Sequence, residues 1–249
     1  MIRYVLALGL VLGACSSAAT PSPSTIQDQA EPPMDLEPGI LDLRSATMSD
    51  GTVIEYGLIL PAGFDSSDQY PVLLALPPGG QDIELAMSVA STTYLPEALA
   101  RGWIVITPAA PGGTLFFQGS ERYVDELLAS LAWIQAEGER IHISGISNGG
   151  RSAFAVASLD PDRYKSMVVF PGYPDSPDDP TALEKFSEIP ISMFVGGEDP
   201  RWIAPMMVTR DTLEGLGASI SLEIRPGEGH VMGSLSDGVD VFDFLDSQR

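Results

Sequence analysis

A serine stands between closely spaced glycines at the junction of a predicted strand and a predicted helix, in Gly145-Ile146-Ser147-Asn148-Gly149-Gly150. Residues 140–144 are short and β-branched, which predicts a buried strand. Residues 151–159 are small and apolar and favour a helix. A residue at such a corner takes a strained backbone conformation, and its neighbours leave room only for glycine. The corner also opens a helix, so amide N–H groups and the helix dipole point at charge that develops beside Ser147.

Residues 39–249 have the size of one large domain, in which apolar stretches alternate with helical patterns. Apolar strands with helices between them predict an α/β fold whose mostly parallel sheet is covered by helices on both faces. An antiparallel hairpin with a turn at Asp50-Gly51 precedes the sheet. The predicted strands are residues 40–46, 53–60, 72–76, 103–107, 140–144, 166–170, 191–195 and 219–224. The predicted helices lie within 82–101 with a break at Pro96, and at 123–136, 151–159, 201–216 and about 235–245.

The glycine-flanked Ser147 resembles the Gly-x-Ser-x-Gly nucleophile elbow of the α/β-hydrolase superfamily. The resemblance covers roughly residues 40–249 and implies the α/β-hydrolase fold. Its local sequence is similar to single-domain esterases, polyhydroxyalkanoate depolymerase-like and feruloyl-esterase-like proteins, and the catalytic domain of prolyl oligopeptidase-type enzymes. The connection 171–190 is short, which predicts a minimal cap. The resemblance implies that Ser147 is a nucleophile.

A serine hydroxyl needs an adjacent base, and the chain has two histidines. His142 lies inside the strand that leads to Ser147, about 16 Å away along an extended chain. This spacing predicts a packed strand residue. His230 follows the last strand in a glycine-rich loop, where the hydrolase fold has its base. His230 is therefore the predicted partner of Ser147.

The acid that orients the histidine is expected after the strand 191–195. The segment Gly196-Gly197-Glu198-Asp199-Pro200 resembles the Gly-x-x-Asp turn of many hydrolases, which implies that Asp199 is the acid. Glu198 and Asp175 are the alternatives. The order Ser147, Asp199, His230 matches the superfamily and differs from the chymotrypsin and subtilisin orders.

Acyl transfer develops an oxyanion, which needs two positioned donors. The resemblance implies that one is the N–H of Asn148, the residue after the nucleophile. The other is expected from Leu76-Pro77-Pro78-Gly79-Gly80-Gln81, which resembles the His-Gly-Gly-Gly loop of esterases with Pro78 at the histidine position. Gln81 is the favoured donor, followed by Gly80. The alternative is an ordinary tight turn, because Pro-Pro-Gly-Gly is also generic turn chemistry.

Four aromatic residues follow predicted strands or the acid and are candidates for contacts with substrate. Their alternative role is plain core packing. They are Phe116, Phe117, Tyr173 and Trp202.

The first residues have the pattern of an export signal, with Arg3, an apolar run and Leu12-Gly13-Ala14-Cys15. The run is too short to span a bilayer, which takes about 20 apolar residues. Its end resembles a bacterial lipobox, which implies that residues 1–15 are a lipoprotein signal and that Cys15 carries lipid. The alternative is an ordinary signal peptide with a chance cysteine. Residues 16–38 are polar and proline-rich, which predicts a disordered tether. The protein is thus expected to be exported and anchored to a bacterial membrane.

The net charge of −21 argues against binding to nucleic acid or anionic lipid, and is typical of a soluble surface. The acidic runs 175–179 and 237–246 lack the spacing of metal ligands, so no metal or cofactor is expected. The resulting prediction is a serine hydrolase that cleaves small-molecule carboxylic esters. A peptidase for short peptides, or a non-catalytic binding lipoprotein on the same scaffold, are the alternatives.

Overall fold

The computed structural model describes residue 1 and residues 31–249. Cys15, the predicted signal and most of the predicted tether lie outside these residues. The domain is built on an eight-stranded sheet with the order β1-β2-β5-β4-β7-β8-β9-β10, and β3 and β6 form a separate pair. The strands are β1 (Leu41–Thr47), β2 (Val53–Ile59), β3 (Gln69–Tyr70), β4 (Val72–Leu76), β5 (Ile104–Pro108), β6 (Gln135–Ala136), β7 (Ile141–Gly145), β8 (Tyr164–Val169), β9 (Ile191–Gly196) and β10 (Ile220–Arg225).

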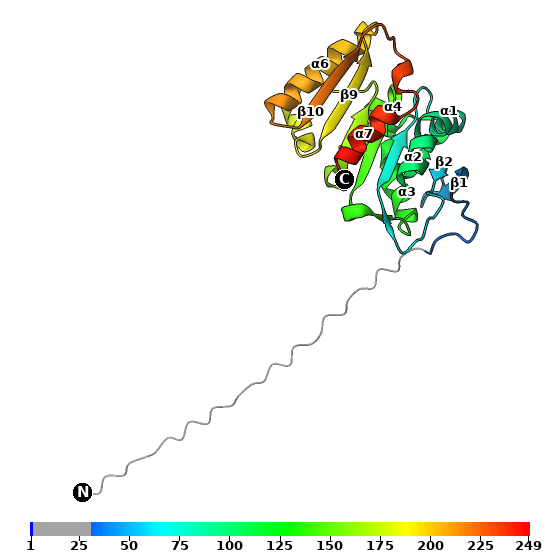
Figure 1. Cartoon of the computed structure of the whole chain (residues 1–249). Helices are drawn as coiled ribbons and strands as arrows, with labels where there is room; N and C mark the ends of the chain where they lie inside the picture. Colours follow the sequence, from blue (N-terminus) through cyan, green and yellow to red (C-terminus); the bar gives the residue numbers. More distant parts are fainter. Residues whose placement is uncertain (2–30) are drawn as a thin grey trace.

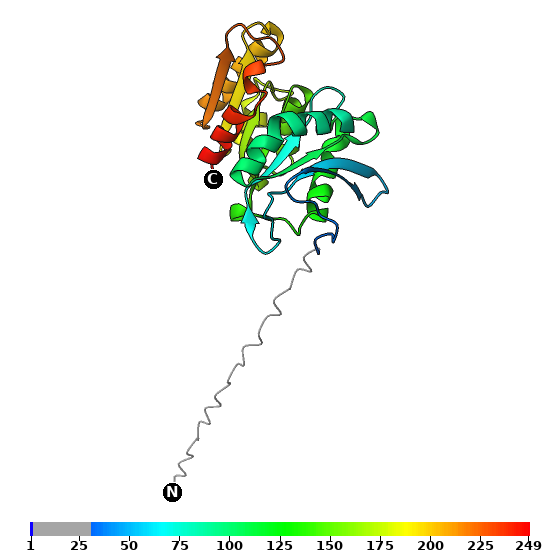
Figure 2. The same cartoon turned by 45° about the vertical axis from the view of Figure 1, so that its right-hand side comes forward.

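The hairpin β1–β2 is antiparallel and β2 pairs antiparallel with β5, whereas every pair from β5 to β10 is parallel. Figures 1 and 2 show the hairpin at one side of the sheet and β9–β10 at the other. This confirms the α/β fold and the opening hairpin predicted from the sequence. In the middle of the sheet, Leu76 pairs with Gly145. The carboxyl ends of β4 and β7 therefore lie side by side, and the segments that follow them meet.

Helices cover both faces of the sheet, with one hydrophobic core under each layer. Side chains of α3 (Val124–Ser130), α4 (Asn148–Ala157) and α6 (Pro200–Gly215) enter one core. Side chains of α2 (Leu95–Arg101) and α7 (Val239–Ser247) enter the other, and these two helices are in contact (Figure 1). The remaining helices are α1 (Ile83–Val89) and α5 (Pro180–Leu183).

Several helix predictions were wrong in their boundaries. The closing helix predicted at about 235–245 begins only at Val239, and Leu235 lies in a short 3-10 helix before it. The helix predicted over 123–136 ends at Ser130, because Leu131 leaves the helical conformation and residues 135–136 pair with β3 as β6. The break predicted at Pro96 lies instead in the π-helical segment Ala90–Tyr94. Pro96 is in the first turn of α2, where the missing N–H of proline needs no partner.

The folded domain begins before residue 39. Leu36 packs against the hydrophobic core, and the Asp35 carboxylate accepts a hydrogen bond of 2.9 Å from Arg44. That contact lowers the pKa of Asp35. Within residues 31–249, no helix is both long and apolar enough to cross a bilayer.

Candidate active site

Ser147 occupies a sharp turn between β7 and α4. Its φ of 56° and ψ of −116° lie in a region that side chains rarely adopt. A Cβ on Gly145 would clash with the carbonyl of Gly149, and a Cβ on Gly149 would clash with the carbonyl of Leu76. The glycines therefore allow β7, the turn and the end of β4 to approach closely. The turn holds the Ser147 hydroxyl at the carboxyl edge of the sheet.

The hydroxyl of Ser147 meets a histidine that is itself held by a carboxylate. Ser147 Oγ lies 2.8 Å from His230 Nε2, and His230 Nδ1 lies 2.6 Å from Asp199 Oδ2. Asp199 directly precedes α6 and its side chain is only 10% exposed, whereas the His230 side chain is 42% exposed. With the proton on Nδ1, the imidazole donates to Asp199 and its Nε2 accepts from the Ser147 hydroxyl. Three predicted residues from distant parts of the chain thus form one hydrogen-bonded series.

The two alternative acids do not contact His230. Glu198 is exposed, while its neighbour Asp199 is buried. Asp175 pairs with Arg151 at 2.5 Å. The geometry favours Asp199 as the carboxylate that orients the histidine.

The predicted oxyanion donors divide into two groups. The side chain of Asn148 donates to the Gly79 carbonyl at 2.8 Å, which joins the elbow to the loop after β4. Among the described residues, the backbone N–H groups of Asn148, Gly79 and Gly80 have no acceptor within the protein. The N–H of Gln81, the donor that the sequence favoured, already donates to the Pro78 carbonyl at 3.0 Å. This finding moves the expected loop donor from Gln81 to the two glycines.

Gln81 instead fixes the loop through the hydrogen bonds of its buried side chain. It is fully buried, and its side-chain Oε1 accepts the Phe116 N–H at 2.8 Å. Its Nε2 donates to the Pro77 carbonyl at 3.1 Å and to Ser152 Oγ at 2.9 Å. Every polar atom of this amide is therefore used to connect the loop, α4 and the segment around residue 116.

His142 lies in β7 and is 2% exposed. Its Nδ1 is 2.7 Å from Ser166 Oγ, and the Trp103 ring packs against it at 4.9 Å between centroids. Burial lowers the pKa of His142 from 6.5 to about 3, helped by the positive charge of Lys165. A histidine in this environment stays neutral and does not reach Ser147.

One of the four predicted substrate-contact residues packs on the histidine, and a second packs on the first. The ring of Trp202 packs 5.1 Å from the ring of His230, and Tyr173 packs 5.0 Å from Trp202. Phe117 lies under the guanidinium of Arg151 at 4.1 Å. Phe116 is fully buried in the core, so its prediction as a substrate contact was wrong.

A chamber of about 410 Å³ opens beside Ser147 and His230. Its walls come from the loop after β4, the end of α1, the π-helical segment, the elbow, the end of β8 and the loop after His230. Sequence reasoning missed most of them, although Val231 and Met232 directly follow His230. The lining residues are Pro78, Gly79, Val89, Thr92, Thr93, Ile146, Ser147, Phe170, His230, Val231, Met232, Leu235 and Ser236.

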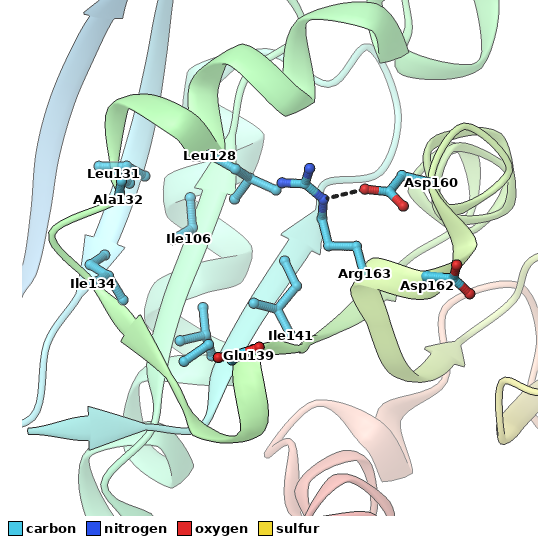
Figure 3. A pocket seen from close by; sticks show the side chains of 12 residues that line it. Ile106, Leu128, Leu131, Ala132, Ile134, Glu139, Ile141, Asp160, Asp162 and Arg163 are labelled. Carbon is cyan, nitrogen blue, oxygen red and sulfur yellow. Dashed lines mark hydrogen bonds and ion pairs between the residues drawn. The ribbon is translucent and has the colours of Figure 1, made fainter. Parts of the chain in front are cut away.

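A second cavity, of about 370 Å³, lies at the opposite end of the sheet (Figure 3). Val72 and Ile141 are the first residues of β4 and β7 and line it together with Arg163, which contacts Asp160 at 3.0 Å. It contains none of the predicted site residues. Across residues 31–249, no group of three or more His, Cys, Asp or Glu side chains is placed to hold a metal ion.

Comparison with known families places the chain in a hydrolase family. A model of the dienelactone hydrolase family matches residues 110–236, more than half of the chain. The chain belongs to the dienelactone hydrolase family. The matched range contains Ser147, Asp199 and His230.

Solved structures share the fold of this family member at low sequence identity. A thermostable esterase is 17% identical with a TM-score of 0.67, covering 84% of this chain and 63% of its own. An S-formylglutathione hydrolase from Agrobacterium tumefaciens is 17% identical with a TM-score of 0.68, covering 83% and 94%. A feruloyl esterase module from Clostridium thermocellum is 17% identical with a TM-score of 0.61, covering 80% and 86%. The chain thus spans less than two thirds of the first esterase.

Proposed function

We propose that the protein is a serine hydrolase that cleaves carboxylic esters through an acyl-enzyme. The observation that carries this proposal is the series Ser147 Oγ, His230 Nε2, His230 Nδ1 and Asp199 Oδ2, with contacts of 2.8 and 2.6 Å. His230 takes the hydroxyl proton while Ser147 attacks the ester carbonyl. Asp199 holds the reactive tautomer and stabilises the imidazolium that forms.

The tetrahedral intermediate needs donors at its oxyanion. The N–H of Asn148, at the start of α4, and a glycine N–H of the loop after β4 supply them. His230 then gives its proton to the leaving alkoxide, which departs as an alcohol and leaves Ser147 acylated. Water, deprotonated by the same histidine, releases the acid and restores the enzyme.

The test is pre-steady-state hydrolysis of p-nitrophenyl acetate. We expect a burst of p-nitrophenol and a mass increase of one acetyl group on the Ser147 peptide, because p-nitrophenolate leaves readily and acylation is then faster than the deacylation that follows it. A matched p-nitroanilide separates the esterase from a peptidase, which would cleave the amide as well as the ester. Folded protein that gives neither a burst nor turnover of any ester would contradict the proposal.

The same proposal includes a lipid anchor at Cys15. The support is the lipobox-like Leu12-Gly13-Ala14-Cys15 and the polar segment that follows it. We expect Cys15→Ser to move the protein from the membrane fraction to the soluble fraction with its specific activity unchanged. Mass spectrometry that finds an unmodified mature N-terminus beyond Cys15 would rule the anchor out.

A further inference from the structure

Among the residues that the structure describes, no Asp, Glu, Lys or Arg lines the chamber beside Ser147 and His230. The chain as a whole has 13 basic and 34 acidic residues. The walls of the chamber are formed largely by apolar side chains, among them Val89, Ile146, Phe170, Met232 and Leu235. A volume of about 410 Å³ is at the lower end of the range of small-molecule sites. The chamber is thus large enough for one part of a small substrate and offers it no ionic partner.

Besides Ser147, three hydroxyl side chains line the chamber, those of Thr92, Thr93 and Ser236, and two of them donate to backbone carbonyls. Thr92 Oγ1 donates to the Ser88 carbonyl at 3.0 Å, and Ser236 Oγ donates to the Gly233 carbonyl at 2.7 Å. Both bonds are made within local helical turns and use the hydroxyl proton, so neither hydroxyl has its proton free for a ligand. The walls therefore present mainly apolar surface to a ligand.

The positively charged side chain that follows the elbow in sequence does not line the chamber. Arg151, one helical turn after Ser147, pairs with Asp175 and covers Phe117, and it lines a different cavity. A carboxylate placed in the chamber would lose its hydration without gaining a charged partner, which is strongly unfavourable. An apolar group of the same size would instead gain free energy by leaving water.

One highly exposed apolar residue also lines the chamber. Val231, the residue after His230, is 88% exposed and lines the chamber. An apolar side chain this exposed beside the reacting groups can be covered by the apolar part of a bound substrate.

We infer that the chamber binds an uncharged, apolar group on one side of the scissile ester, and that the enzyme selects neutral esters over esters with a carboxylate on that side. The inference rests on the proposed ester hydrolysis and adds its substrate class. Each methylene buried there should raise kcat/KM by up to roughly fourfold. Four methylenes, only partly buried, should raise it at least roughly tenfold.

The first test uses the wild-type protein and two matched substrate series. One varies the acyl group: p-nitrophenyl acetate, p-nitrophenyl hexanoate and the mono-p-nitrophenyl ester of adipic acid, which adds a terminal carboxylate. The other varies the alcohol of an acetate in the same way. In at least one series we expect the kcat/KM of the six-carbon neutral ester to be about tenfold higher than that of the two-carbon ester. It should be about a hundredfold higher than that of the charged ester. Flat behaviour in both series, or preference for the charged ester, would overturn the inference.

The second test fills the chamber. Thr92 and Ser91 are neighbours in the π-helical segment, both exposed, and both donate their hydroxyl to the Ser88 carbonyl. Only Thr92 lines the chamber. Thr92→Trp should therefore lower the six-to-two-carbon ratio of kcat/KM at least fivefold, while Ser91→Trp should leave it unchanged. An equal effect of the two variants would contradict the assignment.

The outcomes separate this inference from the proposed function. Suppose that burst kinetics and acetylation of Ser147 are seen without selectivity for chain length or charge. The proposed serine hydrolase would then stand, and the inference that the apolar chamber selects the substrate would be contradicted. Folded protein that gives neither a burst nor turnover of any of these esters would contradict the proposed function itself.

Discussion

His142 and His230 are the same side chain in two environments, and only one of them can serve as a base. His142 is enclosed in β7 between Ser166 and Trp103, and its pKa is lowered to about 3. Within residues 31–249, no carboxylate is hydrogen-bonded to its ring. His230 lies in a loop, 42% exposed, with Ser147 on one nitrogen and Asp199 on the other. Burial keeps the first imidazole neutral at every working pH. The second has a proton donor on one side, a carboxylate on the other and access to water.

The largest effect should come from removing His230 or its hydroxyl partner. We expect Ser147→Ala and His230→Ala each to lower kcat roughly 10⁴- to 10⁶-fold, and the double variant to lose little more, because the members of a triad act as a unit. His142→Gln should keep most of its activity. The measurement is kcat on one soluble ester, with folding checked by thermal melts. Inactive, folded His142→Gln would reverse the roles of the two histidines.

The carboxylate on His230 should give the next effect. Asp199→Asn keeps the shape of the side chain but can stabilise the wrong imidazole tautomer, so kcat should fall by up to ~10⁴-fold, or near 5 kcal/mol of barrier. Glu198→Gln is the matched control, since Glu198 is adjacent and exposed. Its kcat should stay close to the wild-type value. Nearly full activity in folded Asp199→Asn would mean that another acid, Glu198 or Asp175, orients His230.

Much of this contrast could be predicted from the sequence. Ser147, Asp199 and His230 each follow a strand end, and the parallel sheet brings such ends to one edge. The spacing from Ser147 already predicted that His142 belongs to the strand. The walls of the chamber could not be predicted, because Val89, Phe170 and Leu235 are ordinary apolar residues in sequence. Only their meeting around Ser147 distinguishes them from core residues.

Other misassignments have local physical causes. Phe116 follows a strand, as substrate contacts often do, yet its N–H is bonded to buried Gln81 and its ring is enclosed in the core. Gln81 was predicted through its backbone N–H, whereas its side chain holds the loop and its N–H closes a turn. Sequence patterns give the position of a loop but not which of its groups are already bonded.

A smaller effect should be the loss of folding stability at acidic pH that the buried His142 causes. The unfolded chain protonates this residue near pH 6.5, whereas the folded protein resists protonation until about pH 3. The unfolded state therefore binds more protons between these values, and stability falls by about 1.4 kcal/mol per pH unit as pH drops from 6.5 towards 3. From pH 7 to pH 5, this residue should remove roughly 2 kcal/mol.

His142→Gln tests this acid sensitivity. The variant also loses its contact with Ser166, so the change between pH 7 and pH 5 is the informative quantity and absolute stability is not. Urea unfolding at both values should show a decrease about 2 kcal/mol smaller in His142→Gln than in the wild type. Equal decreases would mean that His142 is protonated in the folded protein.

The smallest effect should come from the ring that packs on His230. Trp202 lies 5.1 Å from the imidazole and can stabilise the imidazolium formed during turnover, a contribution of about 0.5–1.5 kcal/mol. Trp202→Leu should lower kcat roughly two- to tenfold, and Trp202→Phe should restore part of it by keeping a ring. The comparison uses kcat on the ester chosen for the triad variants. Identical kcat in all three proteins would remove Trp202 from the reaction.

Reaction with a fluorophosphonate probe tests most directly whether His230, and not His142, activates Ser147. We predict one phosphonate per wild-type molecule, found by mass spectrometry on the Ser147 peptide. His142→Gln should be labelled at a rate close to that of the wild type, and His230→Ala at least ~10³-fold more slowly. Folded wild-type protein that stays unlabelled at Ser147, or rapid labelling of His230→Ala with slow labelling of His142→Gln, would contradict the account.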